Sequence, residues 1–292
     1  MLAPEIAKLL HNSTPVVFEA GLYVKRDDLF ALEPLASIRG GKLRQCVAML
    51  AGTAPSKLIS AGSVHSPQPV IVAYAAQHLG LPCTILVGGK RETPSLILAR
   101  GFGAEIIRCR SGRHTVLFAC ARKIAAPGHF IMPFGMRPEK PCRRFYETCA
   151  VQVRNIPADI RTIVIASGSG VTATIVAYGV WQDRRVHQQI ALLNVGPNRH
   201  RQILETLHAL DPESAQWAAR ENVFQVFPLS QKRGFRYESP ISFNIGRIVL
   251  NPLYEGKAFE WFTSNVNFDA NRTLFWVTGP PIELSTLRAG AR

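Results

Sequence analysis

A chain of 292 residues is long enough for one large domain or two ordinary domains with a substantial core. Hydrophobic residues make up 47% of the chain and charged residues 18%, which excludes an intrinsically disordered chain and is typical of a soluble globular protein. The 34 Lys and Arg residues outnumber the 20 Asp and Glu residues and leave a formal net charge of +14. This excess favours a polyanionic partner such as nucleic acid or an anionic membrane surface, although it can also serve solubility alone.

Neither a secretory signal nor a membrane span is predicted. The N-terminal residues MLAPEIAKLLHNS lack a charged segment followed by a long apolar core. The longest uncharged run, residues 162–182, has Ser, Gly and Thr at its centre and is better explained by a buried strand, a glycine-rich turn and a helix. The six cysteines show no CxxC pair and no paired His spacing, which argues against a zinc site and a disulfide framework. We therefore expect a cytoplasmic protein without a metal site.

Short β-branched segments alternate with helix-like segments along the chain. In chain order, the pattern predicts a strand that begins at 22–30, a helix at 42–50, a strand at 57–62, a helix at 69–80, a strand at 82–89, a helix at 95–103, a strand at 104–109, a helix at 114–125, a strand that runs into a glycine loop at 161–170, a helix at 171–181, and further βα units near 189–196 and 271–279. Residues 128–148 are aperiodic and rich in Pro and Arg, so we expect a long loop there. The alternation predicts an α/β fold with parallel sheets covered by helices on both faces.

Lys42 stands in an unusual setting within the stretch SIRGGKLRQC. It follows Gly40 and Gly41 directly and precedes an apolar, helix-like run. Glycines let the backbone approach a flat, bulky partner closely, which a surface lysine does not need. The alternative is a solvated lysine at the start of a helix.

A second glycine-rich segment, ASGSGVT at residues 166–172, lies between a predicted strand and a predicted helix. Backbone N–H groups at such a junction can hold a phosphate. The spacing matches neither the Walker pattern nor GxGxxG. Taken alone, the segment is as consistent with a tight turn as with a phosphate site.

The order of several segments is more specific than any one of them. These segments are KRDDLF (25–30), GGKLR (40–44), SAGSVHSPQPVIVAYAAQHLGLPCTILV (60–87), ASGSGVTAT (166–174), NPLYEGKAFEW (251–261) and WVTGPP (276–281). Together they resemble the fold type II pyridoxal-phosphate (PLP) enzymes, specifically the 1-aminocyclopropane-1-carboxylate deaminase and D-cysteine desulfhydrase family. The resemblance extends from about residue 22 to residue 281.

The resemblance implies a two-domain α/β fold of the tryptophan synthase β type, with parallel-rich twisted sheets flanked by helices. A smaller domain is expected at about residues 45–150, and a larger PLP-binding domain at residues 1–44 and 151–292. The active site is expected in the cleft between them, because ligands of such sheets bind at the carboxyl ends of the strands.

The resemblance also assigns roles to residues of this chain. Lys42 would form the Schiff base with PLP and later carry a proton. The phosphate would be bound by the glycine loop, through Gly168, Ser169, Gly170 and Thr172. Thr278 is the candidate for facing the pyridine nitrogen, where a hydroxyl in place of a carboxylate would leave that nitrogen largely unprotonated.

The chain departs from the family at several of these positions. The family has Asn before the lysine, where this chain has Gly41. It has Ser-Asn-His or Ser-Asn-Gln where this chain has Ser66-Pro67-Gln68. The family's Asn hydrogen-bonds the phenolic oxygen of the cofactor, and Pro67 can provide neither an amide side chain nor an N–H. Ser66 is still expected to contact the substrate carboxylate or relay a proton, and Gln68 is expected to contact the cofactor.

Two tyrosines complete the set of candidate catalytic residues. Tyr254 in NPLYEGK matches a family tyrosine that faces the substrate, and Tyr237 in RGFRYESP is the candidate for the second active-site tyrosine. Each could equally be a core aromatic residue with a satisfied hydroxyl.

The resemblance and the charge together lead to a PLP-dependent lyase that acts at the α-carbon of an amino-acid group. One hypothesis is decarboxylation or elimination on an amino acid attached to a DNA base, as in thymidine hypermodification of phage DNA, with DNA as a partner. The alternative is deamination or desulfhydration of a small free amino acid such as D-cysteine or 1-aminocyclopropane-1-carboxylate. A third is a catalytically inactive nucleic-acid-binding module of the same fold. No membrane partner is expected, and a homodimer is left open.

Overall fold

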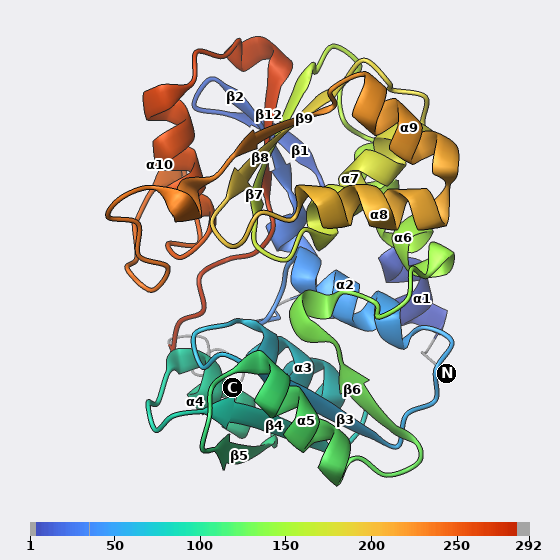
Figure 1. Ribbon diagram of the computed structural model, residues 1–292, viewed down its shortest axis with the longest axis vertical. Helices are drawn as coiled ribbons and strands as arrows, with labels where there is room; N and C mark the ends of the chain where they lie inside the picture. Colours follow the sequence, from blue (N-terminus) through green and yellow to red (C-terminus); the bar gives the residue numbers. More distant parts are fainter. Residues whose placement is uncertain (1–3, 35, 285–292) are drawn as a thin grey trace. The chain divides into compact units, whose positions relative to one another are not determined.

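The computed structural model describes residues 4–34 and 36–284, which form two compact units (Figure 1). Unit 1 contains Phe30–Glu139 together with the first helix, and unit 2 contains His11–Leu29 and Lys140–Pro281. Residues 30–44, with Lys42 among them, therefore belong to unit 1, whereas the sequence placed them with the larger domain. Residues 140–150 belong to unit 2.

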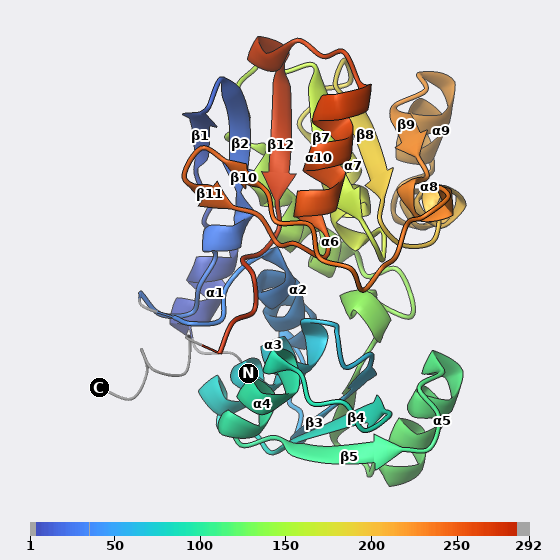
Figure 2. The ribbon, with the colours of Figure 1, turned by 90° about the vertical axis from the view of Figure 1, so that its left-hand side faces the viewer.

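Unit 1 is built on a four-stranded parallel sheet with the strand order β5-β4-β3-β6 (Figure 1; Figure 2 shows β3, β4 and β5 from another side). Along β3, Ile59 and Ala61 pack with Leu117 of α5, whereas Ser60 bonds to Gln68 of α3 on the opposite face. Helices thus cover both faces of the sheet. The elements of unit 1 are α1 (Pro4–Leu10), α2 (Gly41–Leu50), β3 (Lys57–Gly62), α3 (Gln68–His78), β4 (Cys83–Gly88), α4 (Pro94–Gly101), β5 (Glu105–Cys109), α5 (His114–Ile124), β6 (His129–Met132) and the 3-10 turn η2 (Phe134–Met136).

Unit 2 is built on a six-stranded sheet with the order β1-β2-β12-β7-β8-β9, parallel except for the β1–β2 hairpin. Its strands are β1 (Val16–Glu19), β2 (Leu22–Arg26), β7 (Thr162–Ser167), β8 (Gln189–Asn194), β9 (Phe224–Phe227) and β12 (Thr273–Val277), and a small separate hairpin pairs β10 (Asn244–Ile245) with β11 (Ile248–Val249). Its helices are α6 (Arg143–Ala150), α7 (Val171–Gln182), α8 (His200–Leu210), α9 (Pro212–Arg220) and α10 (Glu255–Asn265), with the 3-10 turns η1 (Asp27–Leu29), η3 (Val151–Val153), η4 (Leu229–Gln231) and η5 (Ala270–Arg272).

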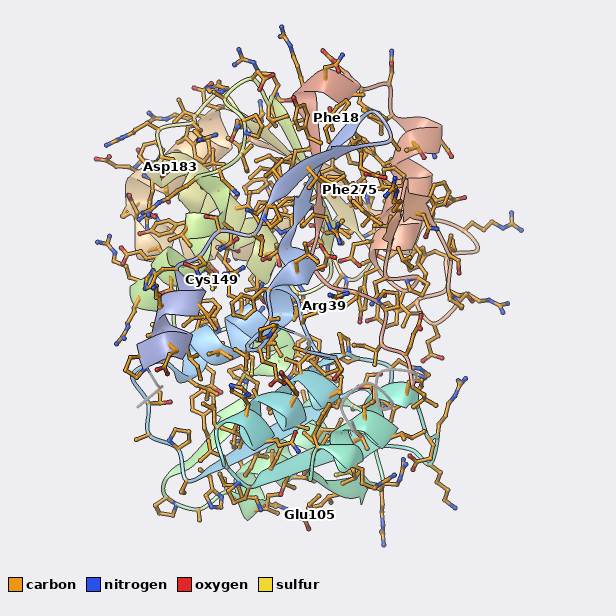
Figure 3. All side chains as sticks on the ribbon, turned by 180° about the vertical axis from the view of Figure 1, so that it is seen from behind. Phe18, Arg39, Glu105, Cys149, Asp183 and Phe275 are labelled. Atoms are coloured by element: carbon orange, nitrogen blue, oxygen red, sulfur yellow. The ribbon has the colours of Figure 1, made fainter. Side chains whose placement is uncertain are left out.

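Aromatic packing fixes α10 on the unit 2 sheet. Phe275 of β12 is fully buried, and Phe259 of α10 meets it edge-to-face with ring centroids 5.0 Å apart. Phe262, on the same helix, joins the same core cluster. Figure 3 labels Phe275 in this core and Phe18 on the edge strand β1, where 55% of Phe18 is exposed.

The structure confirms the predicted α/β fold. Residues 162–182 form β7, a glycine turn and α7, and none of the helices in the described part of the chain is long and apolar enough to cross a membrane. The expected loop at 128–148 is wrong, because this stretch contains β6, η2 and most of α6. Four residues of β6 are enough to pair in parallel with β3, and α6 buries Phe145, Tyr146 and Cys149. The Pro and Arg residues lie between these short elements and hid their pattern.

Candidate active site

Lys42 lies in the first turn of α2, directly after the two glycines. Gly40 has a φ of 116°, a conformation in which a side chain would be strained, and its N–H donates to Phe30 O at 2.7 Å. The neighbouring Leu43 is fully buried, so the helix is anchored while Lys42 stays partly exposed. Lys42 Nζ donates to Gly135 O at 2.9 Å. The lysine amine is therefore held beside η2, at the carboxyl edge of the unit 1 sheet.

Gln68 fixes the backbone segment that accepts this lysine. Its Nε2 donates to Ser60 Oγ (3.2 Å) and Pro133 O (3.1 Å), and its Oε1 accepts the N–H of Gly135 (2.9 Å). The side chain is buried, so these bonds form in a medium where unmade ones are costly. Gln68 thus braces the residue on which Lys42 rests. Its predicted contact with the cofactor stays a prediction.

Ser66 and Pro67 form the turn that leads into α3. Ser66 Oγ accepts the N–H of Gln68 at 3.2 Å, and its carbonyl accepts the hydroxyl of Ser95 at 2.9 Å. Pro67 occupies the N-cap position of α3 with φ −71°. The turn is fixed by these bonds, and Ser66 remains partly exposed at the same sheet edge as Lys42.

In unit 2, the glycine loop joins the carboxyl end of β7 to the N-terminus of α7. Gly170 is the N-cap residue with φ 82°, and no side chain caps the helix. The first-turn N–H groups of an α-helix have no partner within the helix, so this end suits an anion. Gly196 closes the loop from the side, because a Cβ there would lie only 3.3 Å from the Cα of Gly168. Thr172 lies partly exposed in the first turn of α7.

Buried polar atoms without partners lie at this end of the unit 2 sheet. Ser167 and Asn194 are register partners at the ends of β7 and β8. Among the described residues, neither Ser167 Oγ nor the amide atoms of Asn194 have a hydrogen-bond partner, and Glu255 Oε2 also has none. Buried polar groups are normally paired, and unpaired ones call for a ligand or water. These atoms suit a polar ligand such as PLP.

Glu255 is a functional candidate that the sequence reasoning missed. It is the first residue of α10, and its Oε1 accepts the N–H of Thr278 at 3.1 Å as well as the Thr278 hydroxyl. Burial raises the pKa of the Glu255 carboxyl to about 7, and the bonds from Thr278 offset part of that rise. The signal was present in NPLYEGK, where an acidic residue directly follows the candidate tyrosine. Thr278 is therefore accompanied by a carboxyl group.

The structure brings the two predicted tyrosines together. The hydroxyls of Tyr237 and Tyr254 are hydrogen-bonded, and their rings meet edge-to-face with centroids 5.8 Å apart. Burial raises the pKa of both hydroxyls, that of Tyr254 most strongly. Lys257 Nζ donates to Tyr237 O at 2.6 Å and so fixes the backbone at Tyr237. Paired hydroxyls of this kind can pass a proton between them.

The arrangement in each unit is that of a PLP enzyme of fold type II. Residues 10–223 match the family described as "Pyridoxal-phosphate dependent enzyme", and the chain belongs to this family. PLP is accordingly its cofactor. In the part of the chain that the structure describes, no three His, Cys, Asp or Glu side chains are grouped so that they could hold a metal ion.

Named relatives and solved structures agree with this assignment. The chain is 23% identical to the "O-seryl-dTMP PLP-dependent decarboxylase" of Salmonella phage ViI, over 92% of this chain and 80% of that protein. Its fold is similar to that of an ACC deaminase homologue, with a TM-score of 0.67, 20% identity and 95% of both chains covered. It is also similar to the processed threonine deaminase isoform 2 of Solanum lycopersicum, with a TM-score of 0.59, 15% identity and coverage of 98% of this chain and 90% of the other.

Replacing Glu255 should change how stability depends on pH. A carboxyl whose pKa is near 7 in the folded protein and near 4.5 when unfolded binds more protons when folded, so it lowers the free energy of unfolding as pH rises between these values. Glu255→Gln has no titrating carboxyl at this position, so it removes this decrease in the free energy of unfolding with pH. We expect the cofactor-free variant to gain up to about 3 kcal/mol relative to wild type between pH 5 and pH 8 in urea denaturation. Glu260→Gln on the same helix is the control, and a difference that does not change with pH would contradict the expectation.

Gln68→Leu should weaken unit 1 through the lost amide bonds. Three hydrogen bonds disappear with little change in volume, so we expect the free energy of unfolding to fall by about 2–3 kcal/mol. The exposed Gln77→Leu on the same helix is the matched control, with no comparable change expected. An equal stability of both variants would show that the brace contributes nothing.

Proposed function

We propose that this PLP-dependent enzyme is a lyase that acts at the α-carbon of an amino acid attached to a DNA base, by decarboxylation or a related elimination. The observation that carries the proposal is the relative that covers 92% of this chain, whose name specifies a decarboxylase of O-seryl-dTMP. At 23% identity the substrate does not follow from the relationship alone. The charge of the chain provides an independent argument.

A net charge of +14 exceeds what a small free amino acid requires. One or two cationic contacts bind a single carboxylate, whereas a nucleic-acid chain presents a phosphate at every nucleotide. Basic residues of unit 2 are concentrated in 183–185, 198–201 and 231–236, largely in turns and at helix starts. A polyanionic substrate accounts for this distribution.

The residues of the chain divide the chemistry among them. PLP supplies an electron sink for the negative charge that develops at the substrate α-carbon. Lys42 would carry the cofactor and move a proton at the α-carbon, and the glycine loop would bind the phosphate through its N–H groups. Glu255, whose Oε2 has no hydrogen-bond partner within residues 4–34 and 36–284, would hold a proton at the pyridine nitrogen, with Thr278 fixing the carboxyl.

The remaining candidates would act on the substrate itself. Ser66 would contact the substrate carboxylate or relay a proton from the same sheet edge as Lys42. The paired hydroxyls of Tyr237 and Tyr254 would deliver a proton to the product, because a tyrosine hydroxyl is protonated at neutral pH and burial raises the pKa of both further.

A small free amino acid is the second candidate substrate. The hydroxyl pair of Tyr237 and Tyr254 favours it, since the resemblance to deaminases and desulfhydrases rests partly on those tyrosines. An inactive binding module would need neither Lys42 beside a braced acceptor nor a buried carboxyl with a free oxygen. The catalytic readings are therefore preferred to the module.

Lys42 is expected to carry PLP. Borohydride reduction of the PLP-loaded protein, followed by peptide mapping, should place the pyridoxyl group on Lys42 and nowhere else. Lys42→Ala should lose the label, whereas Lys123→Ala, at the far end of α5, should keep it. A label on another lysine of the wild-type protein would refute the assignment.

The substrate class is tested by offering both kinds to the PLP-loaded enzyme. Mass spectrometry should show loss of about 44 mass units, one carbon dioxide, from an aminoacylated thymine nucleotide, because the electron sink promotes that departure. Lys42→Ala should abolish the loss and leave DNA binding nearly intact, since the binding charge lies elsewhere. Robust turnover of free D-cysteine without measurable DNA affinity at low salt would overturn the tethered-substrate proposal.

A further inference from the structure

We propose that the carboxyl edge of the unit 1 sheet binds the nucleotide part of the substrate, with arginines for its phosphate and an aromatic pair for its pyrimidine base. This inference rests on the proposed function, because it specifies how a nucleotide-linked amino acid would be recognised beside Lys42.

The connections at the two edges of the unit 1 sheet differ in charge. The connections that enter β3, β4, β5 and β6, residues 51–56, 79–82, 102–104 and 125–128, contain no Lys, Arg, Asp or Glu. Within unit 1, which ends at Glu139, the connections that leave β4, β5 and β6 contain the basic residues Lys90, Arg91, Arg110, Arg113 and Arg137. We call these five residues the carboxyl-edge cluster. Basic residues also occur near the opposite edge, in the last turns of α4 and α5, but there they lie on helices and not in the connections themselves.

The carboxyl-edge cluster is not neutralised by protein carboxylates. Glu92, in the loop after β4, is ion-paired with both Arg100 and Arg108. Within the described chain, none of the five cluster side chains forms a hydrogen bond or ion pair with another residue, and Glu139 is the other carboxylate in these connections. The cluster therefore leaves a net positive charge for an external anion.

The loops after β4 and β5 are packed against each other without intervening side chains. A Cβ on Gly88 would lie 2.2 Å from the Cα of Gly112, so the two backbones meet directly. Arg108 also donates to Gly89 O at 2.7 Å and holds the next turn of the loop. Arg110 and Arg113 flank Gly112, and Lys90 and Arg91 follow Gly89. Two basic pairs are thus presented from adjoining, braced loops.

An aromatic pair links the start of α5 to η2. The ring of His114, the first residue of α5, packs at a tilt against Phe134 of η2, with centroids 4.1 Å apart and planes at 41°. Phe134 is partly exposed, and the next residue, Gly135, accepts Lys42 Nζ. Gln68 holds the backbone on both sides of Phe134, through Pro133 and Gly135. The hydrogen bonds from Gln68 to Pro133 and Gly135 therefore position both Phe134 and the carbonyl that binds Lys42.

Stacking and charge together match a nucleotide. Bases stack on aromatic side chains, and Arg guanidinium groups bind phosphate through charge-assisted hydrogen bonds. Arg113 directly precedes His114 in the chain, which places a phosphate ligand next to the stacking residue. A free α-amino acid could place its carboxylate on an arginine, but it has no base to stack on the aromatic pair.

The test measures binding of dTMP, thymidine and 2-deoxyribose 5-phosphate to the PLP-loaded enzyme by calorimetry. Arg110→Gln/Arg113→Gln should weaken dTMP and the sugar phosphate about tenfold or more, because each charge-assisted bond is worth roughly that factor. Thymidine binding should be unchanged. The control Arg122→Gln/Lys123→Gln removes the same charge from the far end of α5 and should change all three less than twofold.

The aromatic pair is tested separately. Phe134→Leu should weaken dTMP and thymidine about tenfold, since stacking on one aromatic side chain is worth about that much, and should leave the sugar phosphate unaffected. His114→Gln, at an exposed position, gives the same test if Phe134→Leu loses PLP absorbance. An Arg pair variant that binds like the control, or both aromatic variants binding thymidine like wild type, would overturn the proposal.

Two further arms identify the source of the nucleotide and separate this inference from the proposed function. A short single strand containing thymidine should bind at least as tightly as dTMP, and its affinity should fall as salt rises. The arginine-pair variant and the aromatic variants should each lower this affinity. Binding of a single strand or a duplex that none of these variants affects would contradict the site in polymeric DNA. If wild-type enzyme decarboxylates the aminoacylated nucleotide and the variants match wild type in KM, only the location proposed here fails. If the enzyme instead turns over free D-cysteine and binds no dTMP, the proposed function fails.

Discussion

All four strands of unit 1 run in the same direction, so every connection that leaves a strand reaches the same edge of the sheet. This constraint gathers residues that are far apart in sequence: Ser66 after β3, Arg91 after β4, Arg113 after β5 and Gly135 after β6. Lys42 reaches this edge from α2 through its bond to Gly135 O. Parallel topology, more than any single interaction, therefore decides which side chains can act together.

The parallel strands of unit 2 also bring their carboxyl ends to one edge of the sheet, but the groups gathered there differ from those of unit 1. At the carboxyl ends of its parallel strands lie an uncapped helix N-terminus and unpaired buried atoms, among them those of Ser167 and Asn194. Glu255 is the costliest of these groups, because an ionised carboxylate in such a place loses its hydration. Burial raises its pKa to about 7, so the carboxyl is partly protonated near neutral pH and costs less to bury. In the proposed function this carboxyl would face the ring nitrogen and would withdraw electrons more strongly than Thr278 alone.

The sequence predicted much of this arrangement, and the failures have physical causes. Periodicity located β7 and α7 because both are deeply buried. The two tyrosines were selected through the family resemblance, and the structure pairs their hydroxyls, while their catalytic role stays a prediction. Residues 128–148 were misread because β6 has only four residues and its strand character comes from pairing with β3, a contact no local pattern reveals. Glu255 was missed because a Glu at a helix start is usually a solvated residue, and only tertiary burial gives it another meaning. The brace formed by Gln68 likewise depends on Pro133 and Gly135, more than sixty residues away.

The replacement of the family's Asn by Pro67 has a consequence for the neighbouring residues. Pro67 preserves the start of α3, where its carbonyl accepts the N–H of Ile71 at 3.1 Å, but it offers no side-chain donor to a cofactor. Ser66 stays in place because Gln68 and Ser95 hold it. The turn is therefore held by its neighbours, and Pro67 itself offers only its carbonyl for hydrogen bonding. In the site proposed here, Phe134 and the nearby arginines would bind the base and the phosphate of the substrate. The substrate would then be oriented by its nucleotide, and this attachment would bring the amino-acid group to Lys42.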